Sequence, residues 1–336
     1  MNTLPLGKLD ADFLARLLRD LPTPPEVLVG PGIGRDVAVI DLGHDELLLA
    51  KTDPITFATA AIGYYAVAVN SNDIATSGGL PRWFLATLLL PEAATTPELV
   101  ETIYGQLQDT CQRLGIALVG GHTEVTHGLD RPLLIGQMLG QVRRDELIHP
   151  DGMQPGDVLL LTKGVALEGT SLIAREQREE LLQRGYEPAF LDRCANMLYD
   201  PGIMVLPEAR AICGAIRPHA LHDPTEGGLA TAVWEMAEAS QVGIRLEYEA
   251  IPFLPEAQRL CDEYDLDPLG LIASGSLLAA VAPADAEAAV AACTKAAIAC
   301  TAIGRATELT EGSVLVRDGR EQPLPRFDQD EIARLF

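Results

Sequence analysis

The sequence predicts a two-domain protein of the α/β (α+β) class. At 336 residues the chain has room for two domains of ~150 residues each. Strand-like and helical segments alternate in both halves, with antiparallel-looking turns among them. The turn-rich segment Pro150–Gly156 separates the halves. We therefore predict an N-terminal domain over residues 1–152 and a C-terminal domain over residues 153–336.

The N-terminal half is expected to begin with a helix over Leu9–Leu21, because apolar residues recur at helical spacing up to Pro22. A glycine loop, Gly30–Gly34, then precedes a short strand, and the next strand closes on Asp53-Pro54. Mostly apolar residues predict a buried helix up to Val69. The remaining expected elements are strands over Trp83–Leu90, Ile116–Val119 and Leu133–Arg143 and a helix over Thr96–Leu114.

The C-terminal half repeats this alternation of strands and helices. Its expected strands are Asp157–Thr162, Ala220–Leu221, Val242–Tyr248, the end of Gly270–Val281, Thr301–Thr307 and Ser313–Val316. Its expected helices are Thr170–Arg184, Glu187–Leu198, Leu206–Ile216, Leu229–Ala239, Pro252–Tyr264 and Ala284–Ala297.

Charge and composition narrow the classes of partner. The formal net charge of −23 disfavours nucleic acid, since phosphate binding needs a basic stripe and none is visible. An acidic site can still hold a phosphorylated ligand through Mg²⁺. No apolar run of membrane-spanning length and no signal-peptide core is evident. Six scattered cysteines without a CxxC pair indicate reduced thiols, so we expect a cytoplasmic protein that has no membrane partner.

The stretch Asn70–Pro81, NSNDIATSGGLP, interrupts an otherwise apolar part of the chain. A buried, ionised aspartate is costly unless it is paired or binds a metal. No lysine lies between Lys51 and Lys163, so we expect Asp73 to face a cation or a polar site. The alternative is a helix cap or a solvated loop residue, because Asp and Asn also favour caps and turns.

Four aspartates share a pattern, because each is expected to end or border a strand beside Gly, Asn or Pro. They are Asp36, Asp53, Asp73 and Asp223. Mg²⁺ prefers carboxylate oxygen and keeps waters that phosphates can share. A single aspartate in such a turn is ordinary, but the set of four predicts a metal site.

Several further segments offer weaker signals. The loop Gly30–Gly34 lacks the Gly-Lys-Ser/Thr of a P-loop and precedes a strand, so a flexible turn is the alternative. The segment Gly120–Glu124 follows a strand and combines two glycines with three polar side chains, which is a candidate binding segment. A lone histidine such as His122 is more often a hydrogen-bonded structural residue than a ligand-binding one. Lys163 follows a strand and either meets a phosphate or is solvated. Gly227-Gly228 precedes a helix and offers either free N–H groups for an anion or only close packing.

No Gly-x-Ser-x-Gly elbow, HExxH motif or CxxC cluster is present, so hydrolase triads and zinc chemistry have no support.

Five short motifs occur in a fixed order: G-x-G-x-D-x-A-V-I, T-D, N-D-x-A, G-G-x-T and H-D-P-T-x-G-G. In this order and over nearly the whole chain, the sequence resembles the AIR synthase-like (PurM-like) ATP-binding superfamily. That group includes aminoimidazole ribonucleotide synthetase, selenophosphate synthetase, thiamine-monophosphate kinase and the hydrogenase-maturation protein HypE. The segment HDPTEGGLATAVWEMAEAS is most similar to the HypE branch.

The resemblance implies a PurM-like fold, whose N-terminal domains pair in a homodimer around a β-barrel and whose C-terminal domain is α/β. It also implies ATP in a long groove, with phosphates held through Mg²⁺ by Asp36, Asp53, Asp73 and Asp223. By the same resemblance, Asp73 and Asp223 are candidate catalytic residues. The candidate nucleotide-binding residues are Gly32, Gly34, Asn72, Gly120, Gly121, His122, Thr123, Lys163, Thr225, Gly227 and Gly228.

The chemistry that the resemblance implies is ATP-driven activation of an oxygen on an amide, carboxylate or phosphate acceptor. The partners would be ATP, an unidentified small-molecule or protein acceptor, and a second copy of the chain. A thiamine-monophosphate-kinase-like activity is an alternative, as is a nucleotide-binding regulator or scaffold without turnover.

The sequence departs from the family pattern at several positions. HypE proteins end in a cysteine, whereas the last cysteine here is Cys300, so cyanide-ligand synthesis by the usual route is not expected. Arg35 stands where a second acid is common, and His122 replaces an Asp or Glu. Glu226 replaces the Arg of HDPTRGG, and the early Cys or selenocysteine of selenophosphate synthetases is missing.

Overall fold

The computed structural model describes residues 4, 7–327 and 329–335, in two compact units. The six-stranded unit comprises Pro24–Gly30 and Asp36–Leu147. The seven-stranded unit comprises the described residues of Met1–Thr23, Pro31–Arg35 and Ile148–Phe336. The structure does not describe residues 1–3, 5–6, 328 and 336. Our expectations about export and about a terminal cysteine concern the two termini and therefore fall partly outside the described residues.

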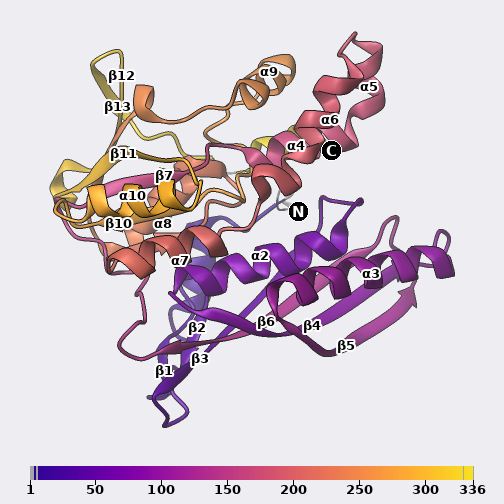
Figure 1. The fold of residues 1–336 in the computed structure, drawn as a ribbon, viewed down its shortest axis with the longest axis horizontal. Helices are drawn as coiled ribbons and strands as arrows, with labels where there is room; N and C mark the ends of the chain where they lie inside the picture. Colours follow the sequence, from indigo (N-terminus) through magenta and orange to yellow (C-terminus); the bar gives the residue numbers. More distant parts are fainter. Residues whose placement is uncertain (1–3, 5–6, 328, 336) are drawn as a thin grey trace. The chain divides into compact units, whose positions relative to one another are not determined.

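The six-stranded unit is one mixed sheet with two helices on one side (Figure 1). Its strand order is β1-β2-β3-β6-β4-β5, and only the pair β4–β5 is parallel. A parallel pair needs a crossover, which helix α3 supplies. The elements are β1 Val27–Val29, β2 Ala38–Ile40, β3 Glu46–Ile55, α2 Ile62–Thr76, β4 Leu80–Pro91, α3 Pro97–Leu114, β5 Ala117–Thr126 and β6 Leu133–Arg143.

Helix α2 is buried over its whole length, because α3 covers one side and strands β3, β4 and β6 cover the other. The expectation that this helix ends at Val69 was wrong, since α2 continues to Thr76. Its polar side chains are tolerated because they bond to nearby backbone. Ser71 and Thr76 donate to the carbonyl groups of Val67 and Asp73. The break comes at Gly78, whose φ of +75° is typical of the residue that follows a helix.

Strand β5 is longer than expected, because it includes Gly120–Glu124, which we expected to follow a short strand over Ile116–Val119. The residues Gly120–Glu124 pair with Leu85–Leu89 of β4, so the strand runs on to Thr126. A Cβ atom on Gly121 would lie 1.9 Å from the Ala86 carbonyl oxygen, and φ at Gly121 is +149°. This glycine therefore permits the close approach of β5 to β4.

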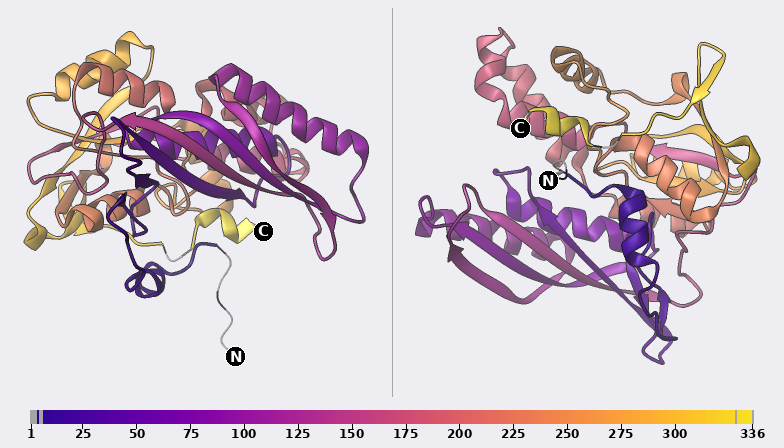
Figure 2. Two further views of the ribbon diagram at one scale, coloured as in Figure 1. Left: turned by 90° about the horizontal axis from the view of Figure 1, so that it is seen from below. Right: turned by 180° about the vertical axis from the view of Figure 1, so that it is seen from behind.

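The seven-stranded unit has the strand order β13-β12-β9-β11-β7-β10-β8. Its chain from β7 to β13 is coloured from pink to yellow in Figures 1 and 2. Its strands are β7 Val158–Thr162, β8 Ala220–His222, β9 Gly243–Glu247, β10 Leu278–Val281, β11 Cys300–Thr307, β12 Ser313–Arg317 and β13 Arg320–Pro323. Its helices are α1 Ala11–Leu18, α4 Leu167–Glu176, α5 Arg178–Gln183, α6 Pro188–Asn196, η1 Leu198–Gly202, α7 Leu206–Ala215, α8 Gly228–Ser240, η2 Tyr248–Ala250, α9 Pro255–Tyr264, α10 Ala286–Lys295, η3 Leu309–Glu311 and η4 Glu331–Leu335.

The mixed α/β class is confirmed, and the elements that sequence patterns missed are short or polar. Strand β1 has three residues, and β13, REQP, has no apolar alternation.

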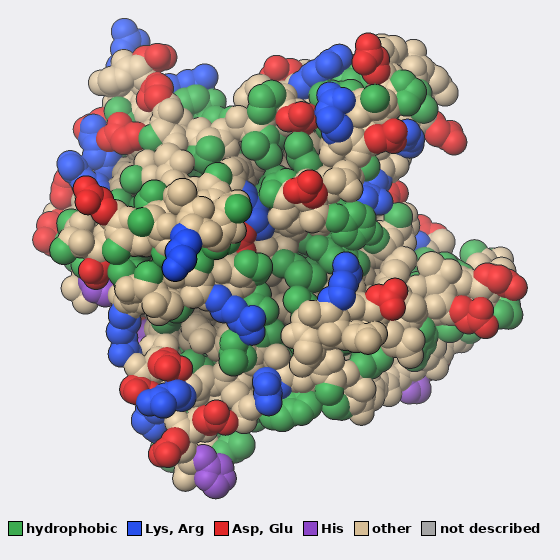
Figure 3. Space-filling view, viewed as in Figure 1, with side chains coloured by type: hydrophobic (Ala, Val, Ile, Leu, Met, Phe, Trp, Pro, Cys, Tyr) green, Lys and Arg blue, Asp and Glu red, His purple; other side chains and the backbone are tan. Residues whose placement is uncertain are grey.

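Acidic and basic side chains are interspersed on the face that Figure 3 shows. None of the helices in the described part of the chain is long and apolar enough to cross a membrane.

Candidate functional site

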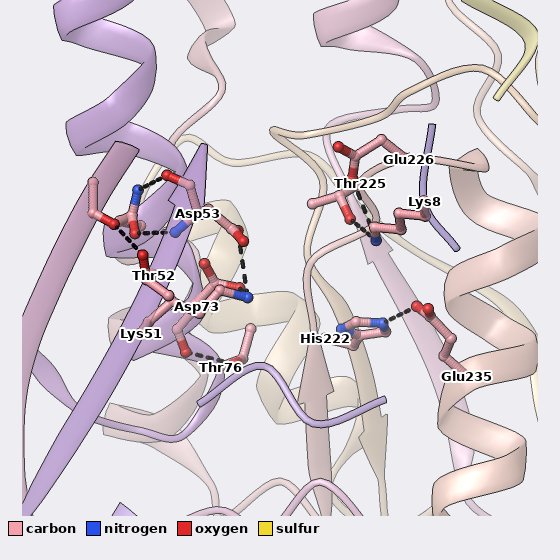
Figure 4. A network of polar contacts seen from close by, with 12 residues as sticks. Lys8, Lys51, Thr52, Asp53, Asp73, Thr76, His222, Thr225, Glu226 and Glu235 are labelled. Carbon is pink, nitrogen blue, oxygen red and sulfur yellow. Dashed lines mark hydrogen bonds and ion pairs between the residues drawn. The ribbon is translucent and has the colours of Figure 1, made fainter. Parts of the chain in front are cut away.

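The centre of the candidate site lies between strand β3 and helix α2 in the six-stranded unit. Lys51 and Asp53 are two residues apart on β3, so their side chains lie on the same face of the sheet. Asp73 comes from α2 and is 2% exposed. The Lys51 Nζ lies 3.0 Å from Asp73 Oδ1 and 3.3 Å from Asp53 Oδ2 (Figure 4).

The charge of a third carboxylate, Asp36, also acts on Lys51. Burial alone lowers the pKa of Lys51, but the nearby charges of Asp73, Asp53 and Asp36 raise it well above its usual value. Lys51 is therefore charged throughout the physiological pH range, surrounded by three carboxylates of the same unit. The expected cation for Asp73 is thus present in the chain itself.

Two expectations about these acids need correction. Asp73 lies inside a helix and does not border a strand, because α2 extends past Val69. Asp53 lies within β3, which continues to Ile55. Asp36 and Asp223 do border strands, since they lie just before β2 and just after β8.

Asn70 fixes the backbone beside Asp53. The Asp53 N–H donates to Asn70 Oδ1 at 3.0 Å, and Asn70 Nδ2 donates to the Ala66 carbonyl at 2.8 Å. A Cβ atom on Gly136 of β6 would lie 2.4 Å from Asn70 Nδ2. Gly136 therefore makes room for the amide that holds β3 against α2, and sequence reasoning missed this role.

The second group of site residues lies in the loop after β8, in the seven-stranded unit. His222 Nε2 lies 3.0 Å from Glu235 Oε2 of α8, and His222 is 4% exposed. Asp223 follows directly and is 1% exposed. Lys8 Nζ contacts Thr225 Oγ1 at 3.1 Å and Glu226 Oε2 at 3.3 Å (Figure 4). Glu226, which departs from the family pattern, thus has a lysine partner within its own unit.

The two glycines before α8 do not present free N–H groups, so that expectation was wrong. Asp330 Oδ2 accepts from the Gly227 N–H at 2.6 Å, and the Thr225 carbonyl accepts from the Gly228 N–H at 3.0 Å. The anion at this helix N-terminus is a carboxylate of the chain itself. Close packing also holds, because a Cβ on Gly228 would lie 2.5 Å from the Leu269 carbonyl oxygen.

Lys163 follows β7, as expected, but is neither solvated nor open to a phosphate. Its Nζ lies 2.7 Å from Glu208 Oε1, 2.9 Å from the Gly202 carbonyl oxygen and 2.6 Å from that of Met204. These contacts match the three N–H donors of an ammonium group. In this conformation Lys163 therefore links β7 to the segment before α7.

The other predicted nucleotide-binding residues are spread over both units. Gly32 and Gly34 belong to the seven-stranded unit, where a Cβ on Gly34 would lie 2.6 Å from the Glu235 carbonyl oxygen. Asn72 is buried in α2. Gly120, Gly121, His122 and Thr123 lie on the exposed edge strand β5, where His122 Nε2 contacts Glu124 Oε2 and Thr123 Oγ1 contacts the Tyr104 hydroxyl.

The segment on β5 does not adjoin the acids on β3. Asp53, Gly136, Ala86 and Gly121 form one row across β3, β6, β4 and β5. Three strand spacings amount to roughly 14 Å. A ligand that contacts both Asp53 and Gly121 must therefore extend across the sheet.

The carboxylates of the six-stranded unit fit a magnesium ion by their chemistry. Asp36, Asp53 and Asp73 supply the oxygen ligands that Mg²⁺ prefers. The Lys51 ammonium between Asp53 and Asp73 shows that these side chains are arranged to hold positive charge.

Family models match both halves of the chain. The N-terminal domain of AIR synthase related protein matches residues 34–142, and the C-terminal domain of the same family matches residues 154–317. The chain belongs to the AIR synthase related family.

Curated relatives agree with this assignment. A Methanocaldococcus jannaschii protein that is named as a hydrogenase expression/formation protein is 30% identical over 77% of this chain and 76% of its own length. Carbamoyl dehydratase HypE of Cupriavidus necator is 31% identical over 77% of this chain and 72% of its own length. The sequence-based prediction of an enzyme of this family is confirmed at the level of the family.

Solved structures confirm the predicted PurM-like two-domain fold. Escherichia coli HypE matches with a TM-score of 0.74, 23% identity and coverage of 96% of this chain and 99% of that one. HypE in complex with ATP matches with a TM-score of 0.68 and 22% identity, over 97% of this chain and all of that one, 100%. AaThiL complexed with AMPPCP and TMP matches with a TM-score of 0.71 and 23% identity, over 96% of this chain and 98% of that one. At this identity the likeness concerns the fold alone.

Proposed function

We propose that the chain is an ATP- and Mg²⁺-dependent enzyme that activates an oxygen of an amide, carboxylate or phosphate acceptor by phosphoryl transfer, in hydrogenase or metallocofactor maturation. The observation that carries the proposal is the placement of the Asp53 and Asp73 carboxylates around a cation. The relatives named as hydrogenase formation protein and carbamoyl dehydratase support the maturation context. The structures named as complexes with ATP and AMPPCP support the nucleotide.

In this mechanism Asp36, Asp53 and Asp73 would hold Mg²⁺, and Asp223 stays a predicted metal ligand through its motif. Mg²⁺ supplies neutralisation of the phosphate charge and orientation of the phosphates. The protein contributes mainly positioning. Asn70 keeps the Asp53 backbone in place, and α2 holds the Asp73 carboxylate away from bulk water. Asn72, Thr225 and the exposed residues Gly120–Thr123 remain predicted nucleotide contacts.

A thiamine-monophosphate-kinase-like activity is the second candidate, favoured by the fold match to AaThiL with TMP. A scaffold without turnover accounts less well for the acids, because the single ammonium of Lys51 offsets only one of the three negative charges of Asp36, Asp53 and Asp73. Clustered carboxylates repel one another unless further cations compensate them. Genes that neighbour this one would separate the two enzymes, since hydrogenase-maturation genes favour the first and a biosynthetic operon the second.

The proposal is tested by calorimetric titration of ATP with and without Mg²⁺. The release of ADP is measured in parallel. We expect ATP binding that depends on Mg²⁺, together with release of ADP in the presence of the correct acceptor. Binding without turnover under any acceptor would favour a scaffold. Absence of Mg²⁺-dependent binding would overturn the proposed function.

We also propose that two copies pair through the six-stranded sheet, as the resemblance predicts. Strand β5 is the edge of the sheet, and its Val119 and Val125 are 53% and 55% exposed. The sheet face opposite α2 and α3 carries half-exposed apolar side chains at alternating positions, including Leu85, Ile135 and Leu139. A long exposed edge with apolar side chains favours pairing with another strand.

The dimer is tested by analytical ultracentrifugation of the wild type and of Val125→Lys. We expect the wild type to sediment as a dimer and the variant to shift to the monomer, because the charge would be buried in the new interface. Val125→Thr, which keeps the branched shape, is expected to remain dimeric. A monomeric wild type would contradict the prediction.

The division into domains at residues 152 and 153 and the cytoplasmic location also remain predictions. The two compact units differ from that division in one respect, since the described residues up to Thr23 and the segment Pro31–Arg35 belong with the second half.

A further inference from the structure

Lys51 is the charged residue of the β3–α2 site that the quoted family motifs do not include. The Lys51 side chain is 18% exposed, compared with 3% for the Asp73 side chain and 30% for that of Asp53. The group that neutralises these carboxylates therefore sits inside the site and not at its rim.

Lys51 and a metal ion would share the same two carboxylate groups. The Nζ lies 3.0 Å from Asp73 Oδ1 and 3.3 Å from Asp53 Oδ2. Mg²⁺ binds its oxygen ligands at about 2.0–2.1 Å and demands a regular arrangement of them. Two cations between the same two carboxylates repel each other strongly in a partly buried site. Binding of one therefore requires that the other moves away.

We propose that the Lys51 ammonium occupies the metal position of the ligand-free site and is displaced from Asp53 and Asp73 when Mg²⁺ is taken up. This inference rests on the proposed function for the identity of the metal. Lys51 is then a positioning residue, which holds the two carboxylates close together before the ligand arrives.

The arrangement has a consequence for the order of binding. Free Mg²⁺ must displace Lys51 without offering it a new partner. Mg²⁺ that arrives with ATP brings phosphate oxygens, which are anionic and accept hydrogen bonds from an ammonium group. The ligand-free wild type is therefore expected to bind the metal weakly, and metal and nucleotide are expected to bind together.

The test is metal binding by nucleotide-free protein, with Mn²⁺ as a spectroscopic substitute for Mg²⁺. Free Mn²⁺ is followed by its electron paramagnetic resonance signal in titrations of the wild type, Lys51→Met and Lys51→Arg. We expect Lys51→Met to bind Mn²⁺ about tenfold tighter than the wild type, or more, because a competing charge is gone. Lys51→Arg keeps the charge and is expected to bind as weakly as the wild type.

Two controls and a second measurement sharpen this experiment. Lys295→Met removes an exposed lysine from α10 and is expected to behave as the wild type. Addition of Asp73→Asn to Lys51→Met is expected to abolish the gain. Thermal unfolding should show that Mg²⁺ raises the melting temperature of Lys51→Met more than that of the wild type. If Lys51→Met does not fold, Lys51→Gln, which keeps hydrogen-bond donors without charge, takes its place.

Equal Mn²⁺ affinity of the wild type and the uncharged variants would overturn the inference about Lys51. That result is distinguishable from failure of the proposed function. If ATP binding still depends on Mg²⁺, the function stands and only the role of Lys51 falls. If the wild type shows no Mg²⁺-dependent ATP binding but Lys51→Met gains Mn²⁺ binding, the inference stands and the assigned function falls.

Discussion

Asp73→Asn is expected to abolish Mg²⁺-dependent ATP binding and to lower ADP release by about 100-fold or more, on the scale of losing one well-placed electrostatic group. Asp73 is 2% exposed and lies 3.0 Å from the Lys51 ammonium. Asparagine keeps the shape of the side chain but removes the charge that would hold the metal. Calorimetric titration of ATP in the presence of Mg²⁺ measures the first effect and single-turnover ADP release the second.

The control for this variant is Asp109→Asn, which changes an exposed aspartate on α3 of the same unit. It is expected to bind ATP and release ADP as the wild type does. Circular dichroism is expected to show that Asp73→Asn is folded, because Lys51 keeps Asp53 as its partner at 3.3 Å. Unchanged ATP affinity in a folded Asp73→Asn protein would show that this carboxylate has no part in the nucleotide site.

Sequence reasoning singled out the acids of the candidate site but did not identify Lys51 as the cation among them. A buried aspartate in an apolar stretch is visible locally, because its cost demands a partner. Its partner Lys51 lies on another element, and only the return of α2 over β3 brings the two side chains within 3.0 Å. The available signal was the i, i+2 spacing of Lys51 and Asp53 on one strand, which places both on one face.

The same limit explains why the partners of the two glycines before α8 and of Lys163 were not predicted. A glycine pair before a helix predicts an anion site, and an anion is indeed bound there, but Asp330 comes from a segment 103 residues away. The Lys163 ammonium contacts the carbonyl groups of Gly202 and Met204 and the carboxylate of Glu208. All three residues lie about 40 positions further along the chain. Local patterns predict that such groups need partners, whereas the topology decides which residues supply them.

The pH dependence of stability is expected to be dominated by Glu168, a residue that sequence patterns did not single out. It lies in the first turn of α4 and is 6% exposed. Burial raises its pKa from 4.5 to about 8, opposed by a hydrogen bond with Ser274 and assisted by the nearby charges of Glu226 and Asp330. Glu168 is therefore mainly protonated in the folded protein at neutral pH.

The sign of the effect follows from proton linkage. Below pH 4.5 both the folded and the unfolded chain hold the Glu168 proton, and its contribution to stability is fully present. Between pH 4.5 and about 8 the unfolded chain releases this proton while the folded chain retains it, so stability falls as the pH rises. At 1.36 kcal/mol for each pH unit between the two pKa values, the loss reaches roughly 5 kcal/mol.

Glu168→Gln mimics the protonated side chain and removes this dependence. Urea unfolding followed by circular dichroism is expected to show similar stability of variant and wild type near pH 4.5 and a variant that is several kcal/mol more stable above pH 8. Glu179→Gln, at an exposed position of α5, should keep the wild-type profile. A wild-type stability that rises between pH 5 and pH 8, or a Glu168→Gln profile parallel to it, would mean that Glu168 is ionised in the folded chain and has a cationic partner there.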